Sequence, residues 1–182
     1  MPHTVASLSL FGDSRRVIIE TIADEFGEPR LTAELIPKKA WGTNLWSVLR
    51  ESDWKRLRTP ACEAANFRCV ICGGVGTKGR IECHERWQVL EDACTQVLIG
   101  LVALCPECHQ VKHIGRAIIH GRGEDAKYHL RRINEWTADQ AARYLDLVFS
   151  LAQLRDLEEN WYVDLSWLRQ FNIFPKAHAG EA

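Results

Sequence analysis

Residues 104–113 read LCPECHQVKH, and they combine a cysteine pair, a histidine pair and the expected start of a helix. Pro106 stands where helices favour proline, in the first turn, and Gly115 stands where a helix commonly ends. The pattern therefore predicts a short helix over 105–114. His109 and His113 are four residues apart, so we expect them to share one face of that helix.

A second cysteine pair lies upstream, in CVIC at 69–72, and has the same spacing as the pair at 105 and 108. Two such pairs supply the four thiolates that tetrahedral zinc prefers, and a closed four-cysteine site is structural. The chain has seven cysteines, an odd number that fits a disulfide framework poorly. We predict a structural Zn²⁺ in an arrangement like a treble clef. Its expected ligands are Cys69, Cys72, Cys105 and Cys108.

Between the two pairs, the sequence predicts two strands. Residues 79–84 alternate between apolar and polar, and TQVLIGLVAL at 95–104 is typical of a buried strand. The predicted order is first cysteine pair, strand, loop, strand, second cysteine pair and helix. This order places His84 at the end of the first strand. Of the three remaining cysteines, Cys62 and Cys94 are assigned to packing.

The flanking segments are mainly helical by their pattern. Ser14 and Gly27 bound a predicted helix over 14–26, and Ser52 starts another that should break near Pro60. After a polar linker, 115–124, we expect helices over 124–134 and 138–158, the second opened by a Thr137–Gln140 capping box. Residues 161–174 predict a short strand or packing segment.

The expected class is α+β, predominantly helical, with a small core between helical extensions. The predicted parts are 1–53, an N-terminal extension packed on the core; 54–116, the core; 117–175, a C-terminal helical extension; and 176–182, a frayed tail.

Composition indicates a globular protein, since 46% of the 182 residues are hydrophobic and 26% are charged. No apolar run is long enough for a membrane span, and the N-terminus lacks the pattern of a secretion signal. We therefore expect a cytoplasmic protein with no membrane association. The net charge is −1, but residues 54–132 carry 13 Lys and Arg against 8 Asp and Glu. This local excess of +5 favours a phosphate-bearing partner, although a solvated surface could also have it.

Taken together, CVICG, IECHERW and LVALCPECHQVKH resemble the HNH endonucleases, in the subgroup with two CxxC zinc knuckles. The resemblance covers about residues 54–116. It implies a ββα-metal, or His-Me finger, core that hydrolyses phosphodiester bonds in DNA with one divalent cation. By the same resemblance, His84 would be the catalytic general base, while His109 and His113 would bind the catalytic cation.

Two positions depart from the family pattern. Cys83 stands where the family usually has an Asp or His metal ligand, and Gly100 stands at the position of the family's asparagine. A thiolate is a poor ligand for Mg²⁺ and a good one for softer ions. Either Cys83 helps to bind a softer metal, or it packs as a small apolar side chain. The candidate cations are accordingly Mg²⁺, Mn²⁺, Ni²⁺ and Zn²⁺.

Basic residues near the predicted site are candidates for backbone phosphate contacts: Arg86, Lys112 and Arg116. DNA is the expected partner, with RNA as the alternative. A second function is open at this point, namely a non-catalytic zinc module that binds nucleic acid or protein after its HNH chemistry has decayed. The apolar spacing of the helix over 138–158 favours docking on its own core, with a partner or dimer surface as the alternative.

Overall fold

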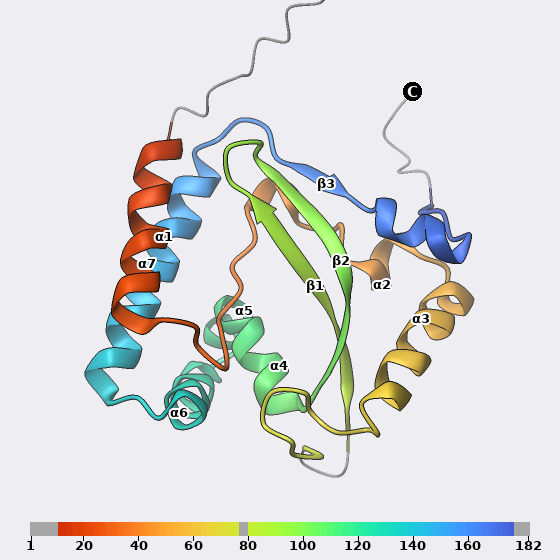
Figure 1. The fold of residues 1–182 in the computed structure, drawn as a ribbon, viewed down its shortest axis with the longest axis horizontal. Coiled ribbons are helices and arrows are strands. Elements are labelled where there is room, and N and C mark those ends of the chain that lie inside the picture. The colour runs from red at the N-terminus through yellow and green to blue at the C-terminus, as the bar shows by residue number, and fades with distance from the viewer. Residues whose placement is uncertain (1–10, 77–79, 177–182) are drawn as a thin grey trace, which may run out of the picture.

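The computed structural model describes residues 11–76 and 80–176 of the chain. Figure 1 shows a long two-stranded hairpin with helices on both sides of it. The helices are α1 (Gly12–Phe26), α2 (Leu45–Val48), α3 (Glu51–Ala64), α4 (Pro106–Lys112), α5 (Ile114–Ile119), α6 (Gly123–Asn134) and α7 (Ala138–Asp156), with 3-10 turns η1 (Lys38–Ala40) and η3 (Ser166–Phe171). The strands are β1 (Glu82–Leu90), β2 (Thr95–Leu104) and β3 (Tyr162–Asp164). The predicted α+β class with mostly helical structure is confirmed.

Strands β1 and β2 form the antiparallel hairpin, and the short β3 lies parallel to β2 at the other edge. The predicted strand over 95–104 matches β2. The first strand is longer than predicted, because residues 85–90 continue the alternation and pair with the start of β2. His84 therefore lies near the beginning of β1 rather than at its end.

The hairpin separates two hydrophobic clusters, because successive side chains of a strand point to opposite faces. One cluster, beneath α4, α5, α6 and α7, includes Leu104, Val111 and Leu130. The other packs α2, α3 and η3 on the opposite face and includes Leu57 and Leu98. Each face of the hairpin thus has its own core, which fixes the direction of every β1 side chain.

The C-terminal helices close the first cluster. Helix α6 matches the prediction over 124–134 within one residue, and α7 has the predicted capping box at Thr137 and Gln140. Ala141, Leu145 and Val148 on α7 are buried against the rest of the chain. This apolar stripe therefore docks on the protein's own core.

Several predictions of helix boundaries are wrong. Helix α3 continues through Pro60, because buried side chains on both sides of it, Leu57 and Cys62, hold that segment in place. The predicted linker 115–124 contains α5, whose Ile114 and Ala117 are buried one turn apart.

Gly115 lies inside α5 and does not end a helix. A Cβ atom at this position would lie 3.2 Å from Leu35 Cδ2, so packing explains the glycine. The predicted caps Ser14 and Ser52 lie inside their helices, which begin after Phe11 and Arg50. Gly27 does end α1, with a φ of 62°.

Some predictions fall on residues without a described structure. The predicted tail 176–182 lies outside the described residues except for Lys176, as do residues 77–79 of the glycine-rich turn. Within the described residues, none of the helices has the length and apolar character needed to cross a membrane.

Candidate metal centres

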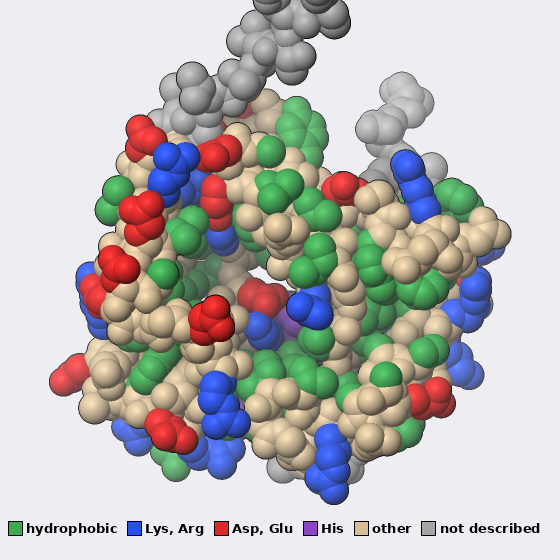
Figure 2. Space-filling view, in the orientation of Figure 1, with side chains coloured by type: hydrophobic (Ala, Val, Ile, Leu, Met, Phe, Trp, Pro, Cys, Tyr) green, Lys and Arg blue, Asp and Glu red, His purple; other side chains and the backbone are tan. Residues whose placement is uncertain are grey.

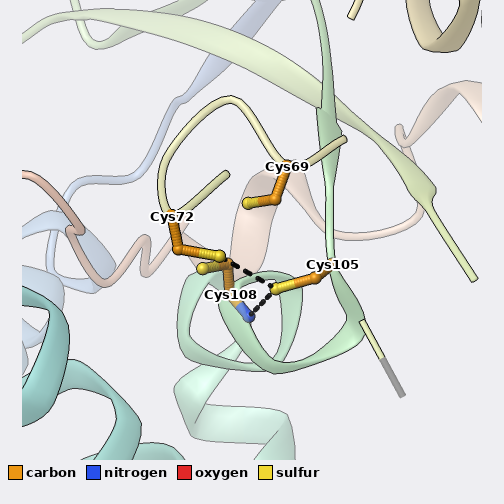
Figure 3. Close-up of side chains that lie close together, drawn as sticks. All are labelled: Cys69, Cys72, Cys105 and Cys108. Atoms are coloured by element: carbon orange, nitrogen blue, oxygen red, sulfur yellow. Dashed lines mark hydrogen bonds between the residues drawn. The ribbon is translucent and has the colours of Figure 1, made fainter. Parts of the chain in front are cut away.

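Four cysteines from two elements lie at one point beside the hairpin. Cys69 and Cys72 come from the loop after α3, Cys105 caps the N-terminus of α4, and Cys108 lies within α4. Their Sγ atoms are all within 4.8 Å of one another. Figure 3 shows the side chains pointing toward a common centre. Four converging sulfurs could hold a metal such as zinc, and the donor set fits a closed tetrahedral site.

Hydrogen bonds to sulfur support this arrangement. The backbone N–H of Gly74 donates to Cys72 Sγ, and that of Cys108 donates to Cys105 Sγ, both at 3.4 Å. His129 Nε2 on α6 lies 3.2 Å from Cys108 Sγ. These contacts surround the sulfurs with donors, which stabilises negative charge on them.

As free thiols, the four cysteines would not all ionise at neutral pH. Burial raises the pKa of Cys105 to about 12, while a hydrogen bond from Cys108 lowers the pKa of Cys69 to about 4. The Cys69 thiolate forms most easily, and its negative charge then helps to raise the pKa of Cys105 and Cys108. A divalent cation removes this repulsion, so the cluster is suited to bind one.

Three histidines, two of them from α4 or its C-cap, form a second group. His84 comes from β1, His109 from α4 and His113 from the break between α4 and α5. Their ring centroids are 4.8 to 5.0 Å apart in each pair. One ring nitrogen of each lies within 4.8 Å of the others, so the group could hold a metal ion.

Carboxylates orient two of these rings. Glu82 Oε2 lies 2.6 Å from His109 Nδ1, and Glu34 Oε2 lies 2.8 Å from His84 Nε2. When each carboxylate accepts an N–H, the other ring nitrogen carries the lone pair. Lys112 Nζ holds Glu34 in place from 2.7 Å. Metal-binding histidines commonly have such carboxylate partners.

The ring nitrogens that face one another fit a shared cation. His84 Nδ1 is buried and has no hydrogen-bond partner within the described parts of the chain. His109 Nε2 and His113 Nε2 lie 3.1 Å apart. Burial lowers the pKa of His109, and burial together with the neighbouring rings lowers that of His113 to about 3. Both imidazoles are therefore neutral at physiological pH, the form that binds metals.

The structure does not bring Cys83 to this group. Cys83 packs on the α3 side of the hairpin with Trp87 and Leu101, since it precedes His84 in the strand and so points the opposite way. Burial raises its pKa to about 12, so it is a neutral thiol there. Of the two interpretations of Cys83, this placement favours packing.

Gly100 lies opposite Arg86 at a β-bulge, where Ile99 is the additional residue. Its φ of 156° is rare for residues with a side chain. The bulge keeps Leu98 and Leu101 on the same buried face. A backbone requirement therefore accounts for glycine at the position of the family's asparagine.

A polar cavity of about 360 Å³ opens beside the histidines. Arg116 and Arg122 line it, together with Glu82 and the two helical histidines. Lys112 instead binds Glu34 and Thr32, and Arg86 is exposed on β1 outside this cavity. Figure 2 shows a hollow near the centre of one face, with histidine and charged side chains deep inside it. Of the three predicted phosphate contacts, Arg116 is the one that lines this cavity.

Sequence reasoning missed Glu34 and Glu82. For Glu82, a signal was present, because strand alternation places it on the same face as His84. For Glu34, no local pattern indicated contact with a strand fifty residues away.

The chain has no match among protein-family models, curated proteins or solved structures.

Proposed function

We propose that this protein is a metal-dependent endonuclease of the HNH type that hydrolyses phosphodiester bonds in DNA. The main support is the convergence of three neutral or carboxylate-supported imidazoles on one point, beside a cavity with two arginines. The cysteine cluster supports the proposal indirectly, because it fixes the start of the helix that carries His109. The likeness of CVICG, IECHERW and LVALCPECHQVKH to HNH enzymes supplies the reaction class.

In this proposal, His84, His109 and His113 bind the catalytic cation. Such a cation would stabilise negative charge on the scissile phosphate and lower the pKa of an attacking water. Glu34 and Glu82 hold His84 and His109 in the binding tautomer.

Arg116 and Arg122 bind phosphate oxygens and orient the substrate.

The assignment of His84 as a ligand differs from the general-base role expected from sequence. His84 is only 2% exposed, and one of its ring nitrogens is hydrogen-bonded to Glu34. A buried ring that contacts both helical histidines is better placed to bind their cation than to reach a water in the cavity.

The test measures bound metal and DNA cleavage on the same samples. Wild type, His84→Ala, His113→Ala and Cys83→Ala are assayed on plasmid and single-stranded DNA with Mg²⁺, Mn²⁺, Ni²⁺ and Zn²⁺. We expect both histidine variants to lose the second metal equivalent and the cleavage. Cys83→Ala, the control on the opposite face of the strand, should keep both.

Each alternative gives a different result. If His84→Ala loses cleavage but retains the second metal, His84 is a base and our ligand assignment is wrong. If wild type binds zinc and DNA but cuts with none of the four metals, the non-catalytic zinc module is correct.

A further inference from the structure

The histidine site borders a second hollow of a different character. An apolar groove of about 530 Å³ lies between residues 34–41, α5 and α7. Its walls include Leu35, Trp41, Ile119 and Phe149. His113 and Arg116 line both this groove and the arginine-lined cavity. The candidate cation site therefore lies between a cationic cavity and an apolar groove.

The groove presents large apolar side chains that the fold leaves uncovered. Trp41 is 61% exposed and Ile119 is 79% exposed, although each is a residue that folding usually buries. The Trp41 indole N–H donates to Ile36 O at 3.3 Å, which restrains the ring. The preceding turn is fixed to α7, since Lys38 N donates to Asp156 Oδ1 at 2.8 Å. Trp41 is thus a restrained aromatic surface at the edge of the groove.

The two hollows select different parts of one ligand. Arg116 and Arg122 have no ion pair within residues 11–76 and 80–176, so their charge is available to an anion. The groove across His113 offers apolar and aromatic surface, which suits a flat heterocycle. A phosphate on one side of the cation and a base on the other match a single nucleotide of a nucleic acid strand.

We propose, on the basis of the nuclease function above, that the substrate contains an unpaired nucleotide whose base enters the Trp41 groove. In an intact duplex, the bases are stacked inside, and only sugars and phosphates would reach this groove. Extruding a paired base costs a few kcal/mol, and that cost is smallest where the base is already unpaired. The groove therefore selects a bulge, mismatch, flap or single strand over continuous duplex.

The test is an equilibrium binding experiment without divalent cations, read by fluorescence anisotropy. Three DNA duplexes of the same sequence are compared: fully paired, with one central unpaired nucleotide, and with an abasic residue in that unpaired position. The abasic duplex has the same number of backbone units and the same phosphates but lacks the base. We expect the duplex with the unpaired base to bind about tenfold more tightly than the other two.

Variants show whether this preference arises in the groove. Trp41→Ala should remove it, and Trp41→Phe should keep most of it because phenylalanine retains the stacking face. Trp46→Ala is the matched control, since Trp46 is similarly exposed, at 65%, but lies on α2 outside the groove. Circular dichroism confirms that each variant is folded.

The outcomes separate this inference from the nuclease proposal. Equal affinity for the three duplexes, or a preference that Trp41→Ala leaves intact, overturns the inference, while cleavage of any DNA by wild type keeps the nuclease proposal. If wild type with divalent metal cuts neither paired nor unpaired DNA, the nuclease proposal fails and the inference fails with it. If wild type cuts DNA, a base-dependent preference that requires Trp41 supports the inference.

Discussion

Glu34 and Glu82 each bind one histidine ring, and they contact no sulfur of the cysteine cluster. If they fix the metal-binding tautomer, the loss of either negative charge should weaken cation binding without unfolding the chain. We expect Glu82→Gln to reduce the affinity of the histidine site for Zn²⁺ or Co²⁺ about 10- to 100-fold, measured by competitive titration. Glu124→Gln is the control, because Glu124 is exposed and contacts only Lys127. Equal affinities in the two variants would contradict the role of Glu82.

Tyr144 provides a prediction for alkaline pH. Its buried hydroxyl accepts a hydrogen bond from Ala33 N at 3.3 Å, and burial raises its pKa to about 12 from the usual 10. The folded protein keeps this proton between pH 10 and 12, whereas the unfolded chain releases it. The contribution of Tyr144 to stability is therefore complete below pH 10 and falls as the pH rises to about 12.

Over that range, the free energy of unfolding of Tyr144→Phe should accordingly fall by about 2 kcal/mol less than that of wild type. Urea denaturation at pH 9 and at pH 11.5 measures the difference. Tyr128→Phe, at an exposed position, should behave like wild type. If the losses are the same for Tyr144→Phe and wild type, the buried hydroxyl does not titrate as described.

Helix α4 connects the two candidate metal centres. Cys105 is its N-cap, Cys108 lies in its first turn, and His109 follows directly. The short helix relies on the cysteine cluster for its position, whereas the cysteine cluster contains no residue of the histidine group. We therefore expect an asymmetry: Cys108→Ser loses both metal equivalents, and His113→Ala loses only one. Elemental analysis of purified variants, with near-ultraviolet circular dichroism, measures this. A Cys108→Ser variant that keeps a wild-type histidine site would show that α4 is positioned without the cysteines.

The sequence was sufficient for the parts of the site that lie within one element. The spacing within each cysteine pair and the four-residue spacing of His109 and His113 are local, so they could be predicted from zinc-ligand patterns and from helix geometry. To predict the position of Cys83, one must know which residues of β1 point to which face of the hairpin. This depends on which hydrophobic cluster covers each face. Glu34 could not be predicted, because its contact with His84 depends on the path of an irregular segment.

A buried network of ion pairs joins three parts of the chain that are distant in sequence. Arg15 of α1 is fully buried and pairs with Glu91 in the hairpin turn and with Glu158 after α7. Arg155 of α7 binds the same Glu91. The far end of the hairpin is therefore held by helices from both extensions, while α4 holds its near end.

Removing Arg15 would take a buried counter-charge away from Glu91 and Glu158, which is more costly than losing an exposed pair, although Arg155 would still pair with Glu91. We expect Arg15→Ala to lower the free energy of unfolding by about 3–5 kcal/mol, measured by urea denaturation. The next residue offers a matched control, because Arg16 pairs with Asp92 on the surface of the same two elements. Arg16→Ala should cost less than about 1 kcal/mol. Similar losses in the two variants would mean that the network does not hold the hairpin turn, and that packing of α1 on α7 alone positions the N-terminal extension.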